Sequence, residues 1–551
     1  MTTGVGGLHG GRGWGGGRAG AGEEPGQGRA GAGEGVDGPR GVRRRRPGAG
    51  RWQSGPMTTF TTTLTAADRT VTVPTGLFLG GSFRAGSDGE TFTVTDPATA
   101  RPLVDVASAT EADAREALDV ACDVADDWAA TPARDRAEIL RRLFESVTAH
   151  GDDLTVLQSL EMGRALPDSR SEVAYGAEFF RWFSECAASV RGDYRHAPSG
   201  SGRIITHHRP VGPVLAITPW NFPLAMATRK IAPALAAGCP IILKPAQLTP
   251  LTMLYLADLA REAGVPDGVL QVLPTHEARR VSSLLGDPRL RKLTFTGSTA
   301  VGQALAKIAA ETTVRTSLEL GGNAPFIVLS HADVTAAAEA AVASKMRNGG
   351  EVCIASNRFI VHEALAPAFT RAVTERMAGY VMGPGTDPAT TLGPMVSAEQ
   401  RDGIADLVDT ALDEGATAVL GGERVTTAEG AVDPAGFYYP ATVLTGVEPD
   451  STIANTEIFG PVLPVQTVAS DEEAVRVAND TPFGLAAYVF GERFPETLDV
   501  AESVQAGMVG VNRGVISDAA APFGGVKQSG IGREGGFEGI DEYLETVYLA
   551  L

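Results

Sequence analysis

The chain has 551 residues, of which 43% are hydrophobic and 21% charged, a composition typical of a globular protein long enough to form two or more domains. Its formal net charge of −19 argues against nucleic acid as a partner, because phosphate binding requires a basic surface. No apolar run approaches the roughly 20 residues of a membrane-spanning helix, and the four cysteines are too widely spaced for a disulfide framework or a metal site, so we expect a cytoplasmic protein with no membrane partner and no metal.

Residues 1–56 differ in composition from the rest of the chain. They are rich in Gly, Ala and Arg, contain few large apolar residues and include the run Arg43–Arg46. Such a segment cannot bury enough apolar surface to offset the entropy lost on ordering, so we expect a disordered tail. The opening Met-Thr-Thr recurs at Met57, directly before the first sequence with a globular pattern, which favours Met57 as the true start of the protein.

Amphipathic helices are predicted in the next part of the chain. Thr110 and Asp113 resemble a capping box, in which the two side chains accept each other's backbone N–H groups where a helix begins. Apolar residues then recur at helical spacing as far as Trp128. Two further amphipathic runs predict helices over 137–147 and 173–190.

Strand-like runs at 191–196 and 203–208 flank a turn rich in Pro, Ser and Gly, which predicts a hairpin. This hairpin has so little core of its own that we expect it to pack against another subunit. The C-terminal run 545–549 is also strand-like and has the pattern of an edge strand that lacks a partner.

Short β-branched runs alternate with helical runs in the middle of the chain. Such alternation is typical of a parallel, doubly wound sheet whose ligands bind beyond the C-terminal ends of the strands. A second α/β series follows from 335 to 522. The predicted strands of the first series are 214–218, 241–244, 269–273, 292–296 and 326–329.

A lone cysteine, Cys353, lies three residues after Gly349-Gly350 in a predicted loop. Glycines leave room around a sulfur atom that a substrate must reach, and they free backbone N–H groups to point at it. The commonest fate of a free cysteine is a small buried apolar residue, so a catalytic role depends on partners elsewhere in the chain.

Three possible partners lie where predicted strands of the first series end. The stretch Thr218–Asn221 contains a side-chain amide, which is costly to bury unless it has a group to bind and which is suited to stabilise an oxyanion. Lys244–Gln247 ends the next strand, where a dinucleotide ribose would lie. Thr296–Thr299 turns a strand into a helix, whose N-terminus favours a pyrophosphate. Each stretch taken singly also has a purely structural explanation. In the order given, these are a turn that enters a helix, a solvated lysine and a glycine turn.

Two acids complete the set. Glu319 lies in an apolar, glycine-flanked stretch, where desolvation would raise its pKa toward neutrality and suit a general base, although it could also be a helix-terminal acid. Glu457 is followed by Ile458-Phe459-Gly460-Pro461 and places an acid beside an aromatic ring.

These six blocks, in this order, resemble the aldehyde dehydrogenase superfamily over residues 75–551, and succinate-semialdehyde dehydrogenases in particular. The resemblance extends to Arg229-Lys230 and to the stretches 479–485 and 521–530. It implies an α/β fold with a Rossmann-type cofactor domain, an α/β catalytic domain and a small β element for assembly into a homodimer or homotetramer. The implied boundaries are 57–190 and 207–320 for the cofactor domain, 321–530 for the catalytic domain, and 191–206 and 531–551 for the oligomerisation element.

The resemblance also implies a role for each candidate residue. Cys353 as thiolate attacks the aldehyde, the Asn221 side chain and the Cys353 N–H hold the oxyanion, Glu319 activates the water that hydrolyses the thioester, and Lys230 belongs to a proton relay. The resemblance implies NADP or NAD as cofactor, bound by Thr218, Trp220, Lys244, Gln247, Gly297, Ser298, Glu457 and Phe459. Gln247 stands where relatives that prefer NAD carry a glutamate, which favours use of NADP at least comparable to NAD.

Substrate choice depends on the residues that would bind a distal carboxylate. Arg347 and Ser517 match two such positions, which favours succinate semialdehyde. A further arginine expected near the end of the long helix is replaced by Ala188 or Ser189, which favours the alternative of an uncharged or aromatic aldehyde. A non-catalytic scaffold on this fold is less favoured, because the nucleophile, base and amide are all retained.

Two positions beside the nucleophile depart from the family pattern. Glu351 replaces the usual Gln and would oppose thiolate formation if its side chain points toward the sulfur. Ala355 stands where some relatives carry a second cysteine, so we expect no disulfide switch.

Overall fold

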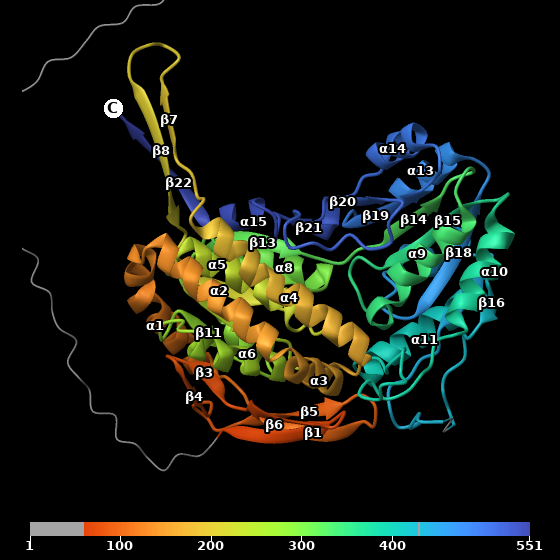
Figure 1. The fold of residues 1–551 in the computed structure, drawn as a ribbon, viewed down its shortest axis with the longest axis horizontal. Helices are drawn as coiled ribbons and strands as arrows, with labels where there is room; N and C mark the ends of the chain where they lie inside the picture. The colour runs from red at the N-terminus through yellow and green to blue at the C-terminus, as the bar shows by residue number, and fades with distance from the viewer. Residues whose placement is uncertain (1–59, 428–429) are drawn as a thin grey trace, which may run out of the picture. The chain divides into compact units, whose positions relative to one another are not determined.

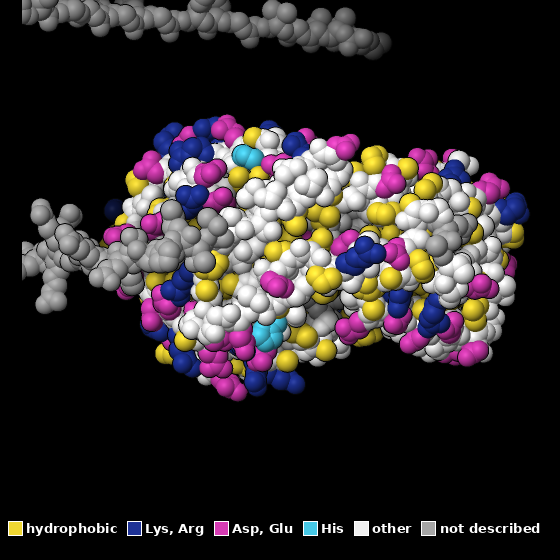
Figure 2. All heavy atoms as spheres, turned by 90° about the horizontal axis from the view of Figure 1, so that it is seen from below, with side chains coloured by type: hydrophobic (Ala, Val, Ile, Leu, Met, Phe, Trp, Pro, Cys, Tyr) yellow, Lys and Arg dark blue, Asp and Glu magenta, His cyan; other side chains and the backbone are white. Residues whose placement is uncertain are grey.

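The computed structural model describes residues 60–427 and 430–551, so the predictions for residues 1–56 and for a start at Met57 lie outside the described ranges. Two large sheets, each covered by helices, make up most of this part of the chain, and a three-stranded sheet extends from it (Figure 1). On the face in Figure 2, acidic and basic side chains are interspersed. No helix within the described ranges is both long and apolar enough to cross a membrane.

The first large sheet has eight strands in the order β21-β13-β12-β9-β10-β11-β3-β4. Its five central strands, from β13 to β11, are parallel, as the alternation of strands and helices predicts. The strands are β3 (Leu77–Leu79), β4 (Ser82–Arg84), β9 (Val214–Ile217), β10 (Ile241–Lys244), β11 (Leu270–Val272), β12 (Lys292–Thr296), β13 (Arg315–Glu319) and β21 (Gly530–Ile531).

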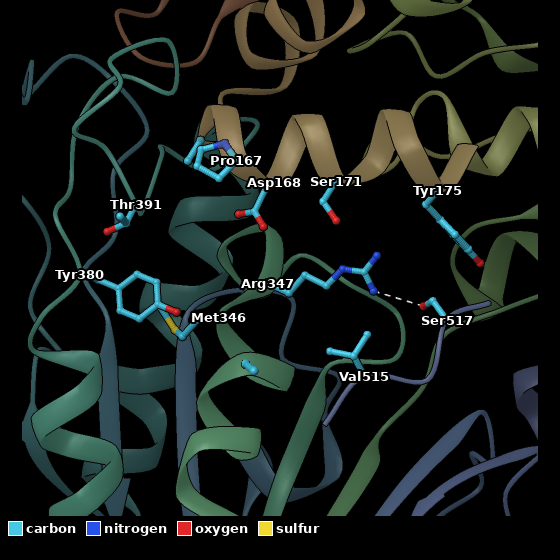
Figure 3. A pocket seen from close by; sticks show the side chains of 12 residues that line it. Pro167, Asp168, Ser171, Tyr175, Met346, Arg347, Tyr380, Thr391, Val515 and Ser517 are labelled. Carbon is cyan, nitrogen blue, oxygen red and sulfur yellow. Dashed lines mark hydrogen bonds between the residues drawn. The ribbon is translucent and has the colours of Figure 1, made fainter. Parts of the chain in front are cut away.

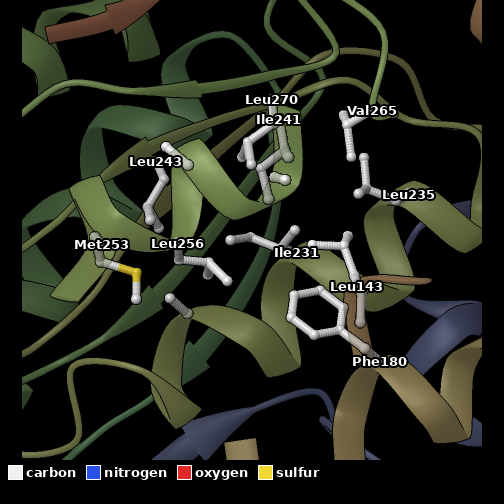
Figure 4. Packing of buried hydrophobic residues seen from close by; sticks show 14 of the residues in the cluster. Leu143, Phe180, Ile231, Leu235, Ile241, Leu243, Met253, Leu256, Val265 and Leu270 are labelled. Atoms are coloured by element: carbon white, nitrogen blue, oxygen red, sulfur yellow. The ribbon is translucent and has the colours of Figure 1, made fainter. Parts of the chain in front are cut away.

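Helices cover both faces of this sheet because its buried strands are apolar on both sides. On β10, Ile241 and Leu243 pack against Ile231 of α5 (Figure 4), whereas Ile242 joins the core on the opposite face with Leu118 of α1. The helices of this part are α1 (Glu111–Ala130), α2 (Ala133–Ala149), α3 (Gly151–Met162), α4 (Leu166–Ala187), α5 (Ala225–Ala237), α6 (Leu251–Glu262), α7 (Ala278–Ser282) and α8 (Thr299–Glu311).

The capping box is confirmed: the Thr110 side chain accepts from the Asp113 N–H, and the Asp113 carboxylate accepts from the Thr110 N–H. The helix predicted over 173–190 is the second half of α4, which ends at Ala187. Neither α3 nor β13 is predicted by the sequence pattern.

The second large sheet has seven strands in the order β16-β17-β18-β15-β14-β19-β20, all parallel except β16. The predicted strand 326–329 lies here within β14, not in the first series. Buried parallel strands are alike in sequence, so the pattern cannot say which sheet such a strand joins. The strands are β14 (Ala324–Val328), β15 (Ser356–His362), β16 (Thr417–Leu420), β17 (Thr442–Thr445), β18 (Val462–Val468), β19 (Ala486–Phe490) and β20 (Met508–Val511).

Helices also cover this sheet, among them α13, whose N-cap Ser470 accepts a hydrogen bond from the Glu473 N–H. The helices are α9 (Val334–Met346), α10 (Ala366–Met377), α11 (Ala398–Asp413), α12 (Thr452–Asn455), α13 (Asp471–Asn479), α14 (Phe494–Ser503) and α15 (Glu538–Asp541), the last of which packs near α5.

The predicted hairpin and the C-terminal strand pair with each other. β8 (Arg203–Pro210) is the central strand between β7 (Asp193–His196) and β22 (Leu544–Ala550), and all three are antiparallel (Figure 1). Two small hairpins near the start of the described chain complete the strands: β1 (Thr61–Ala66) with β2 (Arg69–Pro74), and β5 (Thr91–Asp96) with β6 (Arg101–Ala107).

Candidate active site

Cys353 lies in the short loop between α9 and β15 and is partly exposed. The loop turns sharply at Gly350, which has a φ of +83° and whose position for a Cβ would lie 2.1 Å from the Gly460 carbonyl oxygen. Only glycine fits this close approach between the two chain segments. The close packing of these two segments therefore explains why a glycine precedes the cysteine.

The cysteine lines a cavity of about 320 Å³ at the C-terminal ends of the parallel strands of the first sheet. Parallel sheets bind their ligands at this edge. The cavity is lined by Pro219, Trp220, Asn221, Met226, Thr296, Gly297, Ser298, Leu320, Gly321, Cys353, Gln400, Glu457 and Phe459. Seven of the predicted site residues are therefore brought together here, from stretches up to about 240 residues apart in the sequence.

The Asn221 side chain faces the segment that carries the cysteine. It is buried, and one N–H of its amide donates to the Glu351 carbonyl oxygen at 2.9 Å. Asn348 donates to the same oxygen and to the Asn221 carbonyl oxygen, each at 3.1 Å. Because an amide nitrogen carries two N–H groups, Asn221 keeps one donor for an oxyanion formed at the sulfur.

Glu319 ends strand β13 and is not at a helix terminus. It is 2% exposed, and neither of its carboxylate oxygens has a hydrogen-bond partner among the described residues. Burial, together with the nearby Glu534, raises its pKa well above the usual range. Gly524 leaves the room for this side chain, since a Cβ there would lie 2.9 Å from Glu319 Oε1. A buried carboxylate without partners can bind and deprotonate a water molecule.

Lys230 is fully buried in α5 and forms an ion pair with Glu534, which the sequence reasoning did not find. Arg229, the preceding residue, also pairs with Glu534, with 2.5 Å between Nε and Oε2. Burial alone would raise the pKa of Glu534, but the two cations hold it below its usual value. Two charged residues in the otherwise apolar helix α5 are the only sequence signal of this buried network.

Burial raises the pKa of the Cys353 thiol to about 12. Arg229 and Arg347 lower this pKa, whereas Glu457 and Glu319 raise it. The side chain that the sequence predicts as a thiolate is therefore a thiol at neutral pH in this structure, and its attack requires removal of the proton.

Glu351 does not point toward the sulfur. Its side-chain oxygen accepts from the Val396 N–H at 3.3 Å, and Glu351 is absent from the lining of the cavity that contains Cys353. Burial raises the pKa of Glu351 well above the usual range, which disfavours its charged form. A side chain that points away from the sulfur does not oppose thiolate formation, so the condition stated for Glu351 in the sequence prediction is not met.

Glu457 lines the cavity that contains Cys353. Its Oε1 accepts from the Gly322 N–H at 3.0 Å, and a Cβ at Gly321 would lie 2.6 Å from its Oε2. Burial raises its pKa to about 7. Phe459 packs edge-on against Trp220, with 5.3 Å between the ring centroids, and both rings line the cavity.

The ends of strands β9, β10 and β12 lie where the adenosine part of a dinucleotide is predicted. Lys244 is buried, and burial lowers its pKa to about 8; its Nζ donates to the Pro245 carbonyl oxygen at 3.0 Å. Gln247 is exposed. Ser298 is the N-cap of α8, whose first N–H groups have no acceptor within the helix.

The residues at this edge fit a dinucleotide. The hydroxyl groups of Thr218 and Thr296 are buried and have no hydrogen-bond partner among the described residues. Buried hydroxyl groups are normally paired, so these two indicate a polar ligand. The Gly297 N–H donates to the Glu319 carbonyl oxygen at 3.1 Å, so a pyrophosphate would instead meet the N-terminus of α8 that follows it.

A second cavity, of about 440 Å³, contains the residues predicted to bind a distal carboxylate (Figure 3). Arg347 donates from Nη1 to the Ser517 hydroxyl at 3.2 Å, and its guanidinium lies over the Phe222 ring at 5.1 Å. Ala188 and Ser189, where a further arginine was expected, are exposed beyond the end of α4 and do not line this cavity. The second guanidinium near the thiol comes instead from Arg229 in α5, so the expectation from the long helix was wrong.

Comparison with known proteins identifies a family. Residues 83–549 match the model of the aldehyde dehydrogenase family. The succinate-semialdehyde dehydrogenase of Paenarthrobacter nicotinovorans is 52% identical over 82% of this chain and 98% of the relative. The 3-sulfolactaldehyde dehydrogenase of Pseudomonas putida is 41% identical over 86% of this chain and 96% of the relative. The crystal structure of the succinate-semialdehyde dehydrogenase from Burkholderia pseudomallei matches with a TM-score of 0.84 and 44% identity, over 87% of this chain and 98% of that one.

Proposed function

We propose that this chain, which belongs to the aldehyde dehydrogenase family, oxidises succinate semialdehyde to succinate. The general activity of the family is NAD(P)-dependent oxidation of an aldehyde. The fold and the resemblance found in the sequence motifs agree with this activity. The substrate is the proposal. It rests on the position of Arg347, a guanidinium beside the thiol that donates only to a neutral serine and leaves donors free for a carboxylate.

The first step is attack of the Cys353 sulfur on the aldehyde carbon. Because burial holds the thiol pKa near 12, the sulfur must give up its proton as it attacks, and water at the partly exposed thiol can take that proton. The second N–H of the Asn221 amide and the Cys353 backbone N–H then stabilise the oxyanion of the thiohemiacetal.

A nicotinamide cofactor bound here would supply the hydride acceptor that oxidation of this adduct to a thioester requires. Glu457 and the Trp220–Phe459 contact would hold the nicotinamide end, and Lys244, Ser298 and Thr218 would hold the adenosine and pyrophosphate end.

Hydrolysis of the thioester requires an activated water molecule. Glu319 would deprotonate it, and the ion pair between Lys230 and Glu534 offers an exit for the proton through buried groups. The released product carries the new carboxylate, and the sulfur regains its proton.

The test of the substrate is the variant Arg347→Met. Loss of a charge-assisted hydrogen bond of about 1.5–3 kcal/mol should lower kcat/KM for succinate semialdehyde by about ten- to 150-fold. The same variant should change kcat/KM for butanal, which has no distal charge, by less than about threefold. The control variant is Arg371→Met, which removes an exposed arginine on α10. Equal losses for the two aldehydes, or a wild-type enzyme that prefers butanal, would contradict the proposal.

The alternative of an uncharged or aromatic aldehyde has lost its main support. It rested on the missing arginine near the end of α4, whereas Arg229 now supplies a second guanidinium beside the thiol. A buried guanidinium, a half-buried guanidinium and a neutral serine favour an anionic substrate.

We also propose that the protein is a cytoplasmic homodimer or homotetramer that assembles through the sheet β22-β8-β7. This proposal is supported by the two outer strands of that sheet, which have unpaired edges, and by the exposed side chains of Tyr194, Tyr548 and Leu549.

A further inference from the structure

Tyr175 on α4 lines the 440 Å³ cavity and lies at the end that contains the Arg347 guanidinium and Ser517 (Figure 3). Asp168 and Tyr380 lie toward the other end of the cavity in the same view. Neither the family resemblance nor the charge pattern assigns a role to Tyr175. Its ring packs edge-on against Phe179, with 5.0 Å between the centroids, which restricts where its hydroxyl group can point.

The Tyr175 hydroxyl is buried and has no hydrogen-bond partner among the described residues. Burial raises the pKa of this hydroxyl, whereas the positive charges of Arg229 and then Arg347 lower it. A guanidinium has donors but no acceptor. The oxygen can therefore accept from an arginine, but the hydroxyl proton has no described group to which it can be donated.

We propose that Tyr175 is a specificity-determining residue whose hydroxyl donates a hydrogen bond to the distal carboxylate of the substrate. The inference rests on the proposed function, and it deepens that function by adding a neutral donor to Arg347 and Ser517. A carboxylate has about four acceptor sites, so it can accept from a guanidinium, a serine and a phenol at once. An uncharged aldehyde of the same length offers no acceptor at that position.

The alternative acceptor is the reacting carbonyl oxygen. Its donors, the Asn221 amide and the backbone N–H of Cys353, belong to residues that line the 320 Å³ cavity, whereas Tyr175 lines the other cavity together with Arg347. The position of Tyr175 at the end of the cavity that contains Arg347 and Ser517 favours the distal end of the substrate (Figure 3).

The test is the variant Tyr175→Phe, which removes the hydroxyl and keeps the ring. We expect kcat/KM for succinate semialdehyde to fall by about ten- to 100-fold, as for a hydrogen bond to a charged group, and kcat/KM for butanal to stay within about twofold. The matched control is Tyr438→Phe, because the Tyr438 hydroxyl is also buried without a partner but lies in a separate apolar cluster with Ala98 and Val432. Melting temperatures of both variants check that the fold is retained.

The outcomes separate the inference from the proposed function. If the wild-type enzyme prefers succinate semialdehyde and Tyr175→Phe loses equally on both aldehydes, the hydroxyl acts at the reacting carbonyl and the inference is overturned while the proposed function remains. No loss on either aldehyde also overturns the inference alone. A wild-type enzyme without a preference for succinate semialdehyde overturns both.

Discussion

Gly321→Ala should weaken cofactor binding without weakening the fold. The new Cβ would lie 2.6 Å from Glu457 Oε2, and the other near atoms belong to the side chains of Glu457 and Thr299, each at 3.3 Å. No backbone atom is among these contacts, and the φ of Gly321 lies outside the left-handed region. The strain is therefore relieved by movement of the Glu457 carboxylate.

The size of the effect follows from that movement. An ordinary contact begins at 3.4 Å, so the carboxylate must move by about 0.8 Å, which breaks the 3.0 Å hydrogen bond from the Gly322 N–H or turns the group away from the cavity. If Glu457 binds the nicotinamide ribose, the loss of one charged hydrogen bond, about 1.5–3 kcal/mol, should raise the cofactor Kd by about ten- to 150-fold.

Quenching of protein fluorescence measures this Kd without turnover, because Trp220 lines the cavity. The matched control is Gly403→Ala in the middle of α11, where no atom lies within 4 Å of a new Cβ; it should leave the Kd unchanged and stabilise the helix by about 0.5–1 kcal/mol. An unchanged Kd in Gly321→Ala, with an unchanged melting temperature, would refute the assignment of Glu457 to the cofactor.

Two further substitutions address hydrolysis and cofactor choice. Glu319→Gln should reduce one equivalent of cofactor in a burst and then stall as a thioester on Cys353, and sustained wild-type turnover would rule out a base role. Because burial raises the Glu319 pKa, hydrolysis in the wild-type enzyme should speed up as the pH rises through that pKa, and the variant should lack this rise. Gln247→Glu should shift the ratio of kcat/KM values toward NAD, because a carboxylate repels a 2′-phosphate by a few kcal/mol at about 4 Å; an unchanged ratio would assign the choice to other residues.

Local patterns predicted the strands with β-branched cores and failed where the strand is polar. The predicted bounds of β10 and β12 agree with the structure, because each is a short run composed mainly of Ile, Leu, Thr and Phe between turn residues. Strand β13, Arg-Thr-Ser-Leu-Glu, has only one large apolar residue and is held by pairing with β12 and β21. Its tertiary partners, which a local pattern cannot contain, decide its conformation.

The same limit applies to the site. Residues inside short motifs, such as Asn221 and Cys353, were found because each motif has its own chemistry. Glu534 was not found, because its role depends on its contact with Lys230, which lies 304 positions earlier. Tyr175 was missed for the same reason: on the helix it is one aromatic residue of an amphipathic pattern, and only the cavity shows that its hydroxyl lacks a partner.

The balance of charge around the thiol explains why an anionic aldehyde suits this site. Arg229 and Lys230 share one carboxylate, Glu534, and Arg347 donates to the neutral Ser517, so these three cations outnumber the carboxylates of Glu534 and Glu319 even when Glu319 is ionised. A substrate carboxylate supplies the missing negative charge. That same charge opposes ionisation of Cys353, by about 4 kcal/mol for two unit charges 4 Å apart near a protein surface. Selectivity for such a substrate must therefore arise from binding of the distal carboxylate and not from a more acidic thiol. Removal of the thiol proton then costs the most free energy when the preferred substrate is bound.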